Sequence, residues 1–498
     1  MGLFSIFGRT APAKVPTDRI VPLRYWDDLH YLRSICHDFT LRFDDVLDVS
    51  NLEASLARLM EIGDWGQLGA RLRLNAKGKL EYHIPVRYDE ERPGFVFTTS
   101  KYDMSIQDHP LGSQLPGANQ DQSFLSPSSE TFAPLVRHPD SPKELADWIY
   151  TDRPQLHIHV TLFQDTTLLT LSYVHTFSDA ISRTNFLNAW LAVLRGRECD
   201  IPAFLPYDLD PLRKLGREAS GKNYSNFRRL LTGFSLIIFG VRLLFEMYWF
   251  RNVEEHPIRL PKRCVGRMRT KVLEKLAAAD PKGVEMPFVS EGDVIISWWV
   301  KTLTSALKVA PDRTIMVMNV FNIWSLFPEC FPHGAAGFIS NGFFYSYTLL
   351  TASKVRKDTN LDYVASTNRK ALLEHRTRDQ VQAMTALQRA AFMQAAPVVG
   401  DSKLLFMAAT NQHKARYFEL DFSAAVVSPG VPLNKRPHAL GRPSYINDIE
   451  YSQNYPTRNI VRIIGKDAAG DWHLLFKTRA AAWPAIHTQL MELIKMET

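Results

Sequence analysis

The chain has 498 residues, of which 45% are hydrophobic and 22% are charged. This length and balance exclude a low-complexity chain and indicate a globular protein with two domains. The net charge is +7. The basic residues are spread along the chain without the dense cluster that is typical of nucleic-acid binding, so we expect no nucleic-acid partner.

The four cysteines lie far apart in the sequence, at Cys36, Cys199, Cys264 and Cys330. No two of them form a Cys-x-x-Cys pair, which argues against a disulfide framework and against a structural zinc site. The pattern favours a reducing compartment. We therefore expect a cytoplasmic location and no metal site. Separately, we expect a monomer with no permanently bound cofactor.

The N-terminal part is predicted to form a tail over residues 1–18 and a first α/β half over residues 19–200. A helix is expected over residues 51–68, where leucines recur at helical spacing and Asn51 can cap the first turn. A turn over residues 75–78 separates two strand-like stretches, as in a hairpin.

Residues 93–142 are rich in Pro, Ser, Gly and Gln and are predicted to be mainly loop. A more regular part follows, with strands expected over residues 156–163 and 168–174 and a helix beginning at Ser178. His175 therefore falls where a strand ends and a helix begins. At such junctions the scaffold holds a side chain that still faces open space.

Residues 201–270 are expected to connect the two halves, and they contain one long apolar segment, residues 231–250. The segment is long enough for a membrane span, but Arg242 and Glu246 lie within it. We expect a helix that is buried or covers the protein surface. Peripheral membrane contact is the second interpretation, and a transmembrane span is the third.

Residues 271–498 are predicted to form a second half in which helices and strands again alternate. The expected elements are a helix from Ser290, a strand over residues 314–320, a loop over 334–343, a helix near 378–395, a strand near 402–409, a hairpin at 465–470 and a final helix. Alternation in both halves predicts mixed α/β layers.

The sharpest chemical feature is His175-Thr176-Phe177-Ser178-Asp179. A histidine at the end of an apolar strand suits acid–base work, because its ordinary pKa lies near neutrality. Asp179 is expected either to pair with the imidazole or to fix the backbone around it. Taken alone, the spacing is weak, since a chain with 15 His and 52 acidic residues contains such pairs by chance. The ordinary interpretation is a structural histidine with a capping aspartate.

The wider context resembles the BAHD acyltransferases and their fungal branch, which includes trichothecene acetyltransferase-like proteins. That family has a strand–turn–strand that ends in His-x-x-x-Asp-Gly, and residues 154–180 follow the same layout. Residues 52–85 resemble the early helix and hairpin of the family. Residues 290–303, 338–342 and 410–423 resemble segments of its second domain. The resemblance covers most of the chain in the same order.

The resemblance implies two similar mixed-sheet α/β domains of the chloramphenicol acetyltransferase-like type, with an active-site channel between them. It implies His175 and Asp179 as catalytic residues and a structural role for Asp421. Asn411, Ser423, Phe177 and Asn341 are the expected substrate contacts. Three departures stand out: Ala180 replaces the usual Gly, residues 423–425 replace Gly-Trp-Gly, and the second-domain Arg that pairs with the motif Asp has no clear counterpart.

The implied function is transfer of an acyl group, most simply acetyl, from acyl-CoA to a hydroxyl or amine of a hydrophobic secondary metabolite. The partners are then acyl-CoA and a hydrophobic acceptor. Two alternatives stay open. A repurposed relative would catalyse a CoA-independent cyclisation or rearrangement of a hydrophobic natural product, and a binding protein would need no base at His175. Neither His-Glu-x-x-His nor Gly-x-Ser-x-Gly occurs, which excludes common metallohydrolase and serine-hydrolase motifs.

Overall fold

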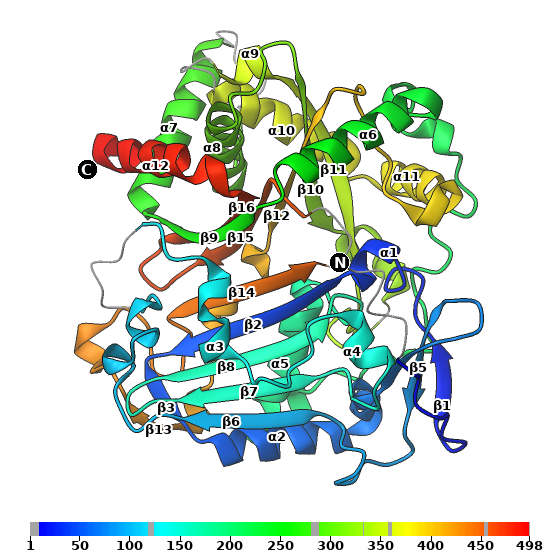
Figure 1. Ribbon diagram of the computed structural model, residues 1–498, viewed down its shortest axis with the longest axis vertical. Helices are drawn as coiled ribbons and strands as arrows, with labels where there is room; N and C mark the ends of the chain where they lie inside the picture. Colours follow the sequence, from blue (N-terminus) through cyan, green and yellow to red (C-terminus); the bar gives the residue numbers. More distant parts are fainter. Residues whose placement is uncertain are drawn as a thin grey trace.

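The computed structural model describes residues 9–117, 124–279, 288–331, 333–356, 361–452 and 457–497. The first eight residues of the predicted tail lie outside the described residues. The chain forms two α/β halves, one above the other in Figure 1, and each half is built on its own mixed sheet. The predicted fold class, two mixed-sheet α/β domains, is confirmed.

The sheet of the first half has the strand order β14-β2-β8-β7-β6. All neighbours pair antiparallel except β6 and β7, which are parallel. The strands are β2 (Ile35–Phe43), β6 (Val96–Lys101), β7 (His157–Leu162), β8 (Thr167–Val174) and β14 (Tyr445–Ser452). β8 is buried along its whole length, so its end is a rigid position for a side chain.

The sheet of the second half has the order β11-β10-β12-β15-β16-β9. The pairs β10–β12 and β12–β15 are parallel, and the others are antiparallel. The strands are β9 (Val253–Leu260), β10 (Thr314–Asn322), β11 (Phe343–Thr351), β12 (Leu405–Asn411), β15 (Ile460–Lys466) and β16 (Trp472–Arg479).

One excursion of the C-terminal half packs on the first half. It supplies β14, which pairs with β2, and β13 (Val426–Pro429), which pairs with β3 (Asp45–Leu47). In the same excursion, the ring of Phe422 lies 4.9 Å from that of Phe43. The two halves are therefore interlocked by the chain as well as packed against each other. β1 (Arg19–Pro22), β4 (Arg71–Leu74) and β5 (Leu80–Ile84) form a small further sheet.

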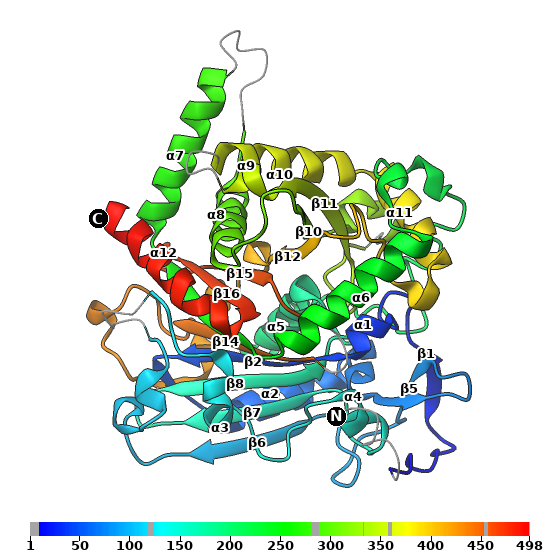
Figure 2. The same cartoon turned by 45° about the horizontal axis from the view of Figure 1, so that its top comes forward.

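Helices pack on both sheets (Figures 1 and 2). The first half carries α1 (His30–Arg33), α2 (Val49–Glu61), α3 (Ala133–Val136), α4 (Leu145–Ile149) and α5 (Ala180–Leu194). The second half carries α7 (Lys262–Ala279), α8 (Glu291–Ala306), α9 (Ala352–Val355), α10 (Leu361–His375), α11 (Arg378–Ala390) and α12 (Trp483–Glu497). Each half has its own buried apolar core.

Several elements differ from the sequence predictions. α2 is capped by Asp48, whose carboxylate accepts the Asn51 N–H at 3.0 Å, and not by Asn51 as predicted. The region 93–142, expected to be mainly loop, contributes β6 to the first sheet. The predicted connector 201–270 contributes β9 to the second sheet.

The apolar segment 231–250 forms the helix α6 (Gly233–Trp249). It crosses the upper half of the molecule on its outer surface, in green in Figures 1 and 2. Phe239 is its one buried residue. The helix therefore packs on the surface of the protein, and none of the other described elements packs over it. Throughout the described ranges, no helix combines the length and the apolar character that crossing a membrane requires.

Candidate active site

His175 follows directly on β8 and is fixed through its backbone from both halves of the molecule. Its N–H donates to the carbonyl of Ile35 at 2.8 Å, which continues the pairing of β8 with β2. Its carbonyl accepts from the Asn341 side chain at 3.0 Å. Asn341 belongs to the loop before β11, so the second half holds the histidine at the end of a strand of the first.

The imidazole of His175 lines the cavity between the two sheets. Its ring centroid lies 5.3 Å from that of His37 and 6.0 Å from that of Phe343. Burial, together with the neighbouring His37, lowers the pKa of His175 to about 3. The ring is therefore neutral at physiological pH, which is the form that can accept a proton.

Asp179 is the N-cap of α5, and its carboxylate is occupied by backbone donors. Oδ1 accepts the N–H groups of Ile181 at 3.0 Å and Ser182 at 2.9 Å, while Oδ2 accepts the N–H of Gly342 at 2.9 Å. Burial raises the pKa of Asp179, against which these hydrogen bonds act. Gly342 thus takes the place of the arginine that the resemblance led us to expect. The carboxylate joins the helix that follows His175 to the loop that holds it.

Gly342 also has to be a glycine on steric grounds. A Cβ at this position would lie 1.8 Å from Nε1 of Trp324, closer than any side chain allows. The same loop is anchored by Asp27, whose Oδ1 accepts from the Asn341 N–H and from its side-chain amide, both at 2.8 Å. The loop from Ser340 to Gly342 is therefore a fixed support for His175.

Behind His175 lies a buried ionic network that crosses between the two sheets. His37 Nδ1 is 2.9 Å from Oδ1 of Asp448 on β14, and Oδ2 of Asp448 accepts from Arg462 on β15 at 2.6 Å. Arg462 also donates to both carboxylate oxygens of Glu255 at 2.7 Å. Burial alone would raise the pKa of Asp448, but Arg462 and then His37 outweigh it and lower the pKa to about 2.

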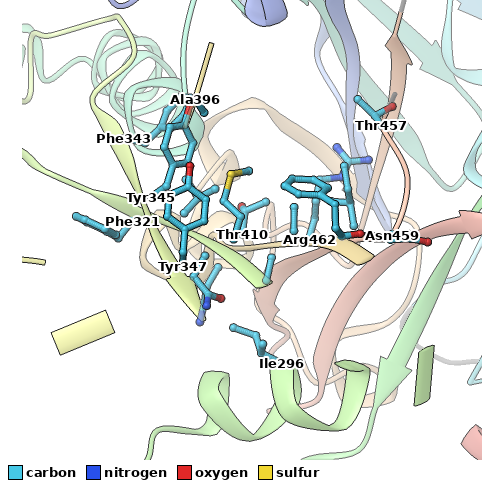
Figure 3. A pocket seen from close by; sticks show the side chains of 18 of the residues that line it. Ile296, Phe321, Phe343, Tyr345, Tyr347, Ala396, Thr410, Thr457, Asn459 and Arg462 are labelled. Atoms are coloured by element: carbon cyan, nitrogen blue, oxygen red, sulfur yellow. Dashed lines mark hydrogen bonds between the residues drawn. The ribbon is translucent and has the colours of Figure 1, made fainter. Parts of the chain in front are cut away.

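The cavity has a volume of about 1060 Å³, and its two sides differ in chemistry. One side is an aromatic wall of Phe321 on β10 with Phe343, Tyr345 and Tyr347 on β11 (Figure 3). The opposite side, around Arg462, is polar. A large apolar surface with a few fixed polar groups is typical of small-molecule binding sites.

The structure brings only some of the predicted site residues together. His175, Asp179 and Asn411 line the cavity. Phe177 instead lies in the first core, with its ring 5.6 Å from that of Tyr173. Asn341 supports His175 from behind, and Ser423 is exposed in the excursion that packs on the first half. The expectation that Phe177, Asn341 and Ser423 contact substrate is therefore corrected.

Asp421 also lies in that excursion, away from the cavity. Its carbonyl accepts from Arg195 at the end of α5 at 2.5 Å, and its carboxylate lies 3.6 Å from both Arg195 and Arg442. These contacts tie the excursion to α5.

Sequence reasoning missed His37, Asp448, Arg462, Tyr345 and Tyr347. His37 and Asp448 come from paired strands more than 400 residues apart in the chain, so no local pattern links them. The alternating aromatics of β11 were a usable signal, because alternate residues of a strand face the same side. Within the described residues, no group of three or more His, Cys, Asp or Glu side chains is placed to hold a metal ion.

The chain is similar over nearly its full length to curated fungal proteins. It is 39% identical over 497 residues to the acetyltransferase adrJ of Penicillium roqueforti, with 99% of each chain covered. It is 36% identical to the acetyltransferase sphE of Aspergillus fumigatus, with 98% of each covered. It is also 34% identical, with 99% of each covered, to a Penicillium decumbens protein named transcriptional regulator calD. No family model matches the chain.

Solved structures share the fold at low sequence identity. TRI101 of F. sporotrichioides, crystallised with coenzyme A and T-2, superposes with a TM-score of 0.66 at 14% identity, covering 94% of this chain and 97% of its own. Vinorine synthase superposes with a TM-score of 0.58 at 15% identity, covering 97% and 96%. At these identities the likeness concerns the fold.

The interlocked two-sheet fold and the strand-end histidine in the cavity between the sheets define the class of two-domain acyltransferases. Within that class, the full-length similarity to the Penicillium and Aspergillus acetyltransferases decides the family. The chain belongs to the family of these fungal acetyltransferases and O-acyltransferases, and it is an enzyme of that family.

Proposed function

We propose that the enzyme transfers an acyl group, most simply acetyl, from acyl-CoA to a hydroxyl of a hydrophobic secondary metabolite, with His175 as the general base. The observation that carries the proposal is the neutral imidazole of His175, which lines a large cavity next to Phe343 of the aromatic wall. Relatives named acetyltransferase, and a structural neighbour, F. graminearum TRI101, that holds both coenzyme A and T-2 mycotoxin, support it.

The reaction needs one proton shuttle and no covalent acyl-enzyme. The acceptor hydroxyl gives its proton to a ring nitrogen of His175 while its oxygen attacks the thioester carbonyl. The tetrahedral intermediate then expels the CoA thiolate, and the imidazolium returns the proton to the sulfur. An ester and free CoA leave. Asn411 lines the cavity and is our candidate donor to the oxyanion.

The two substrates are assigned to different parts of the cavity by their chemistry. The rings of Tyr345 and Tyr347 offer flat apolar surface to a polycyclic acceptor. Arg369, Arg376 and Lys414 also line the cavity, and cationic side chains of this kind suit the phosphates of coenzyme A. Asp179 acts as a positioning residue, since its oxygens are taken by backbone N–H groups.

The test combines acetyl-CoA calorimetry with a thiol-release assay on a pool of hydroxylated hydrophobic metabolites. His175→Ala should bind acetyl-CoA as wild type does, but its thiol release should fall by about 10²–10⁴-fold, the usual contribution of a positioned base. His487→Ala, an exposed histidine on α12, is the matched control and should retain full activity.

Two results would contradict the proposal. If the folded protein binds no acyl-CoA, the CoA-independent cyclisation becomes the better hypothesis for the function of the cavity. If His175→Ala keeps wild-type thiol release, acyl transfer stands but another group is the base.

A further inference from the structure

The outward face of α6 is apolar along its whole length. Six large side chains on it are between 61% and 76% exposed: Phe234, Ile237, Val241, Leu244, Phe245 and Tyr248. They recur three or four residues apart, with Phe245 beside Leu244, so they fall on one face of the helix. A continuous exposed apolar strip of this kind marks a surface that something else covers.

The opposite face of α6 holds the helix firmly on the protein. Phe239 is buried in an apolar cluster, against which Leu243 also packs. At the C-terminal end, Arg458 donates to the carbonyls of Glu246 at 3.1 Å and Phe250 at 3.3 Å. The helix is thus apolar on two opposite faces, of which the protein covers only one.

Exposed cations frame the apolar strip. Arg228 and Arg229 precede the helix, Arg242 lies along its flank and Arg251 follows it, and all four are exposed. The one carboxylate of the helix, Glu246, is paired with Arg313 at 2.7 Å. The charge around the strip is therefore positive at both ends.

This charge pattern selects the occupant. Two copies of the chain that paired through α6, in either direction, would bring arginine-bearing ends against each other, and such like-charge contacts are unfavourable. An anionic bilayer complements the pattern, because apolar side chains enter the acyl region while arginines meet the headgroups. Tyr248 and Trp249 suit the boundary between the two, where amphipathic rings collect.

We propose that α6 is an interfacial helix that docks the enzyme on an anionic lipid bilayer, lying in the plane of the membrane. Its 17 residues span about 25 Å at 1.5 Å per residue. This length is less than the thickness of the hydrocarbon core of a bilayer, as expected of a helix that lies in the membrane plane. The outward strip enters the bilayer, and the four arginines contact anionic headgroups.

The docking would place the cavity beside the lipid. Leu244 lines the cavity and is also 65% exposed, so the cavity reaches the surface at α6. Gly240, Leu243 and Met247 of the same helix line the cavity as well. If the proposed acyl transfer holds, a hydrophobic acceptor dissolved in the bilayer can enter at this rim. The docking itself does not depend on that activity.

The experiment is co-sedimentation of the full chain with vesicles of phosphatidylcholine alone and of phosphatidylcholine mixed with phosphatidylserine. Wild type should bind the mixed vesicles, and Ile237→Asp/Phe245→Asp should weaken binding by about tenfold or more. Neither residue lines the cavity. Val427→Asp is the matched control, since Val427 is 67% exposed on β13, at the far end of the molecule (Figure 1). It should bind as wild type does.

A second variant separates the charge contribution from the apolar one. Arg228→Glu/Arg229→Glu should reduce the preference for phosphatidylserine while the folded state, followed by thermal unfolding, is kept. Absence of wild-type binding to the mixed vesicles overturns the proposal. So does a dimer in sedimentation equilibrium that Ile237→Asp/Phe245→Asp dissociates, because the strip would then belong to a second copy. Vesicle binding is read without turnover, so its failure is distinct from failure of acyl transfer.

Discussion

His175 is kept neutral by its burial and by the neighbouring His37. The carboxylate oxygens of Asp179, four residues away, accept hydrogen bonds from the backbone N–H groups of Ile181, Ser182 and Gly342. Burial and the neighbouring His37 lower the pKa of the imidazole to about 3. A low pKa makes the base weaker, but it keeps the whole population of enzyme in the form that accepts a proton.

The low pKa predicts an unusual pH profile. Protonation switches the base off only as the pH falls through the pKa of His175 in the folded protein, so kcat/KM should stay level from about pH 8 down to about pH 5. A histidine of ordinary pKa, about 6.5, would lose about nine tenths of its neutral form at pH 5.5. Measurement of kcat/KM across this range decides the matter, and an acid limb near pH 6.5 would show that the site does not depress the pKa.

At the scale of elements, α5 and the loop before β11 are joined through a single carboxylate. Asp179 caps α5 within the first half and accepts the Gly342 N–H of the second. The next residue toward the N-terminus in that loop, Asn341, holds the carbonyl of His175. Loss of the carboxylate should therefore disturb the support of the base as well as the helix end.

Asp179→Ala should lower the free energy of unfolding by about 1–3 kcal/mol, through the lost cap and the buried N–H groups left without a partner. It should also lower kcat while the Kd for acetyl-CoA changes little. Asp48→Ala is the control for the loss of a helix cap alone, because Asp48 caps α2 through the Asn51 N–H at 3.0 Å, away from the cavity. It should lose stability and keep kcat. Equal kcat values in the two variants would show that Asp179 stabilises the helix end and does not position the base.

At the scale of the whole molecule, the two halves are linked by strand exchange and by charge. β14 leaves the C-terminal half to complete the first sheet, and Asp448 on it is bound by Arg462 of the second sheet. Arg462 is held in turn by Glu255 on β9. We expect the halves to unfold together, because the first sheet is incomplete without the chain of the second half.

Arg462→Met should lower the melting temperature strongly. The substitution leaves the buried carboxylates of Asp448 and Glu255 without their cation, a change that costs about 3–5 kcal/mol. Scanning calorimetry should show a single transition for wild type and a lower Tm for the variant. Arg58→Met, which breaks an exposed pair with Glu198 at 2.9 Å, should barely move the Tm. Two separate transitions in the wild-type scan would show that the halves are independent units.

The local sequence determined the elements whose pattern is regular and self-contained. The strand pair before His175, α5, α8, β10 and the hairpin of β15 and β16 all follow from spacing, caps and turns that neighbouring residues set. Their order along the chain, with the His-x-x-x-Asp motif, was enough to predict the family, and the motif is the basis on which His175 is proposed as the base. These features depend on contacts within a few residues, which the sequence displays directly.

The tertiary structure alone decided how the site is completed. β14 returns to pair with β2, which brings Asp448 to His37, and the loop at Gly342 reaches across to Asp179. It also decided that Phe177 is core and that α6 faces outward. An apolar segment has the same sequence pattern whether or not the protein covers it. A hydrogen bond between residues hundreds of positions apart leaves no local sequence pattern. Burial and long-range pairing belong to the folded chain as a whole.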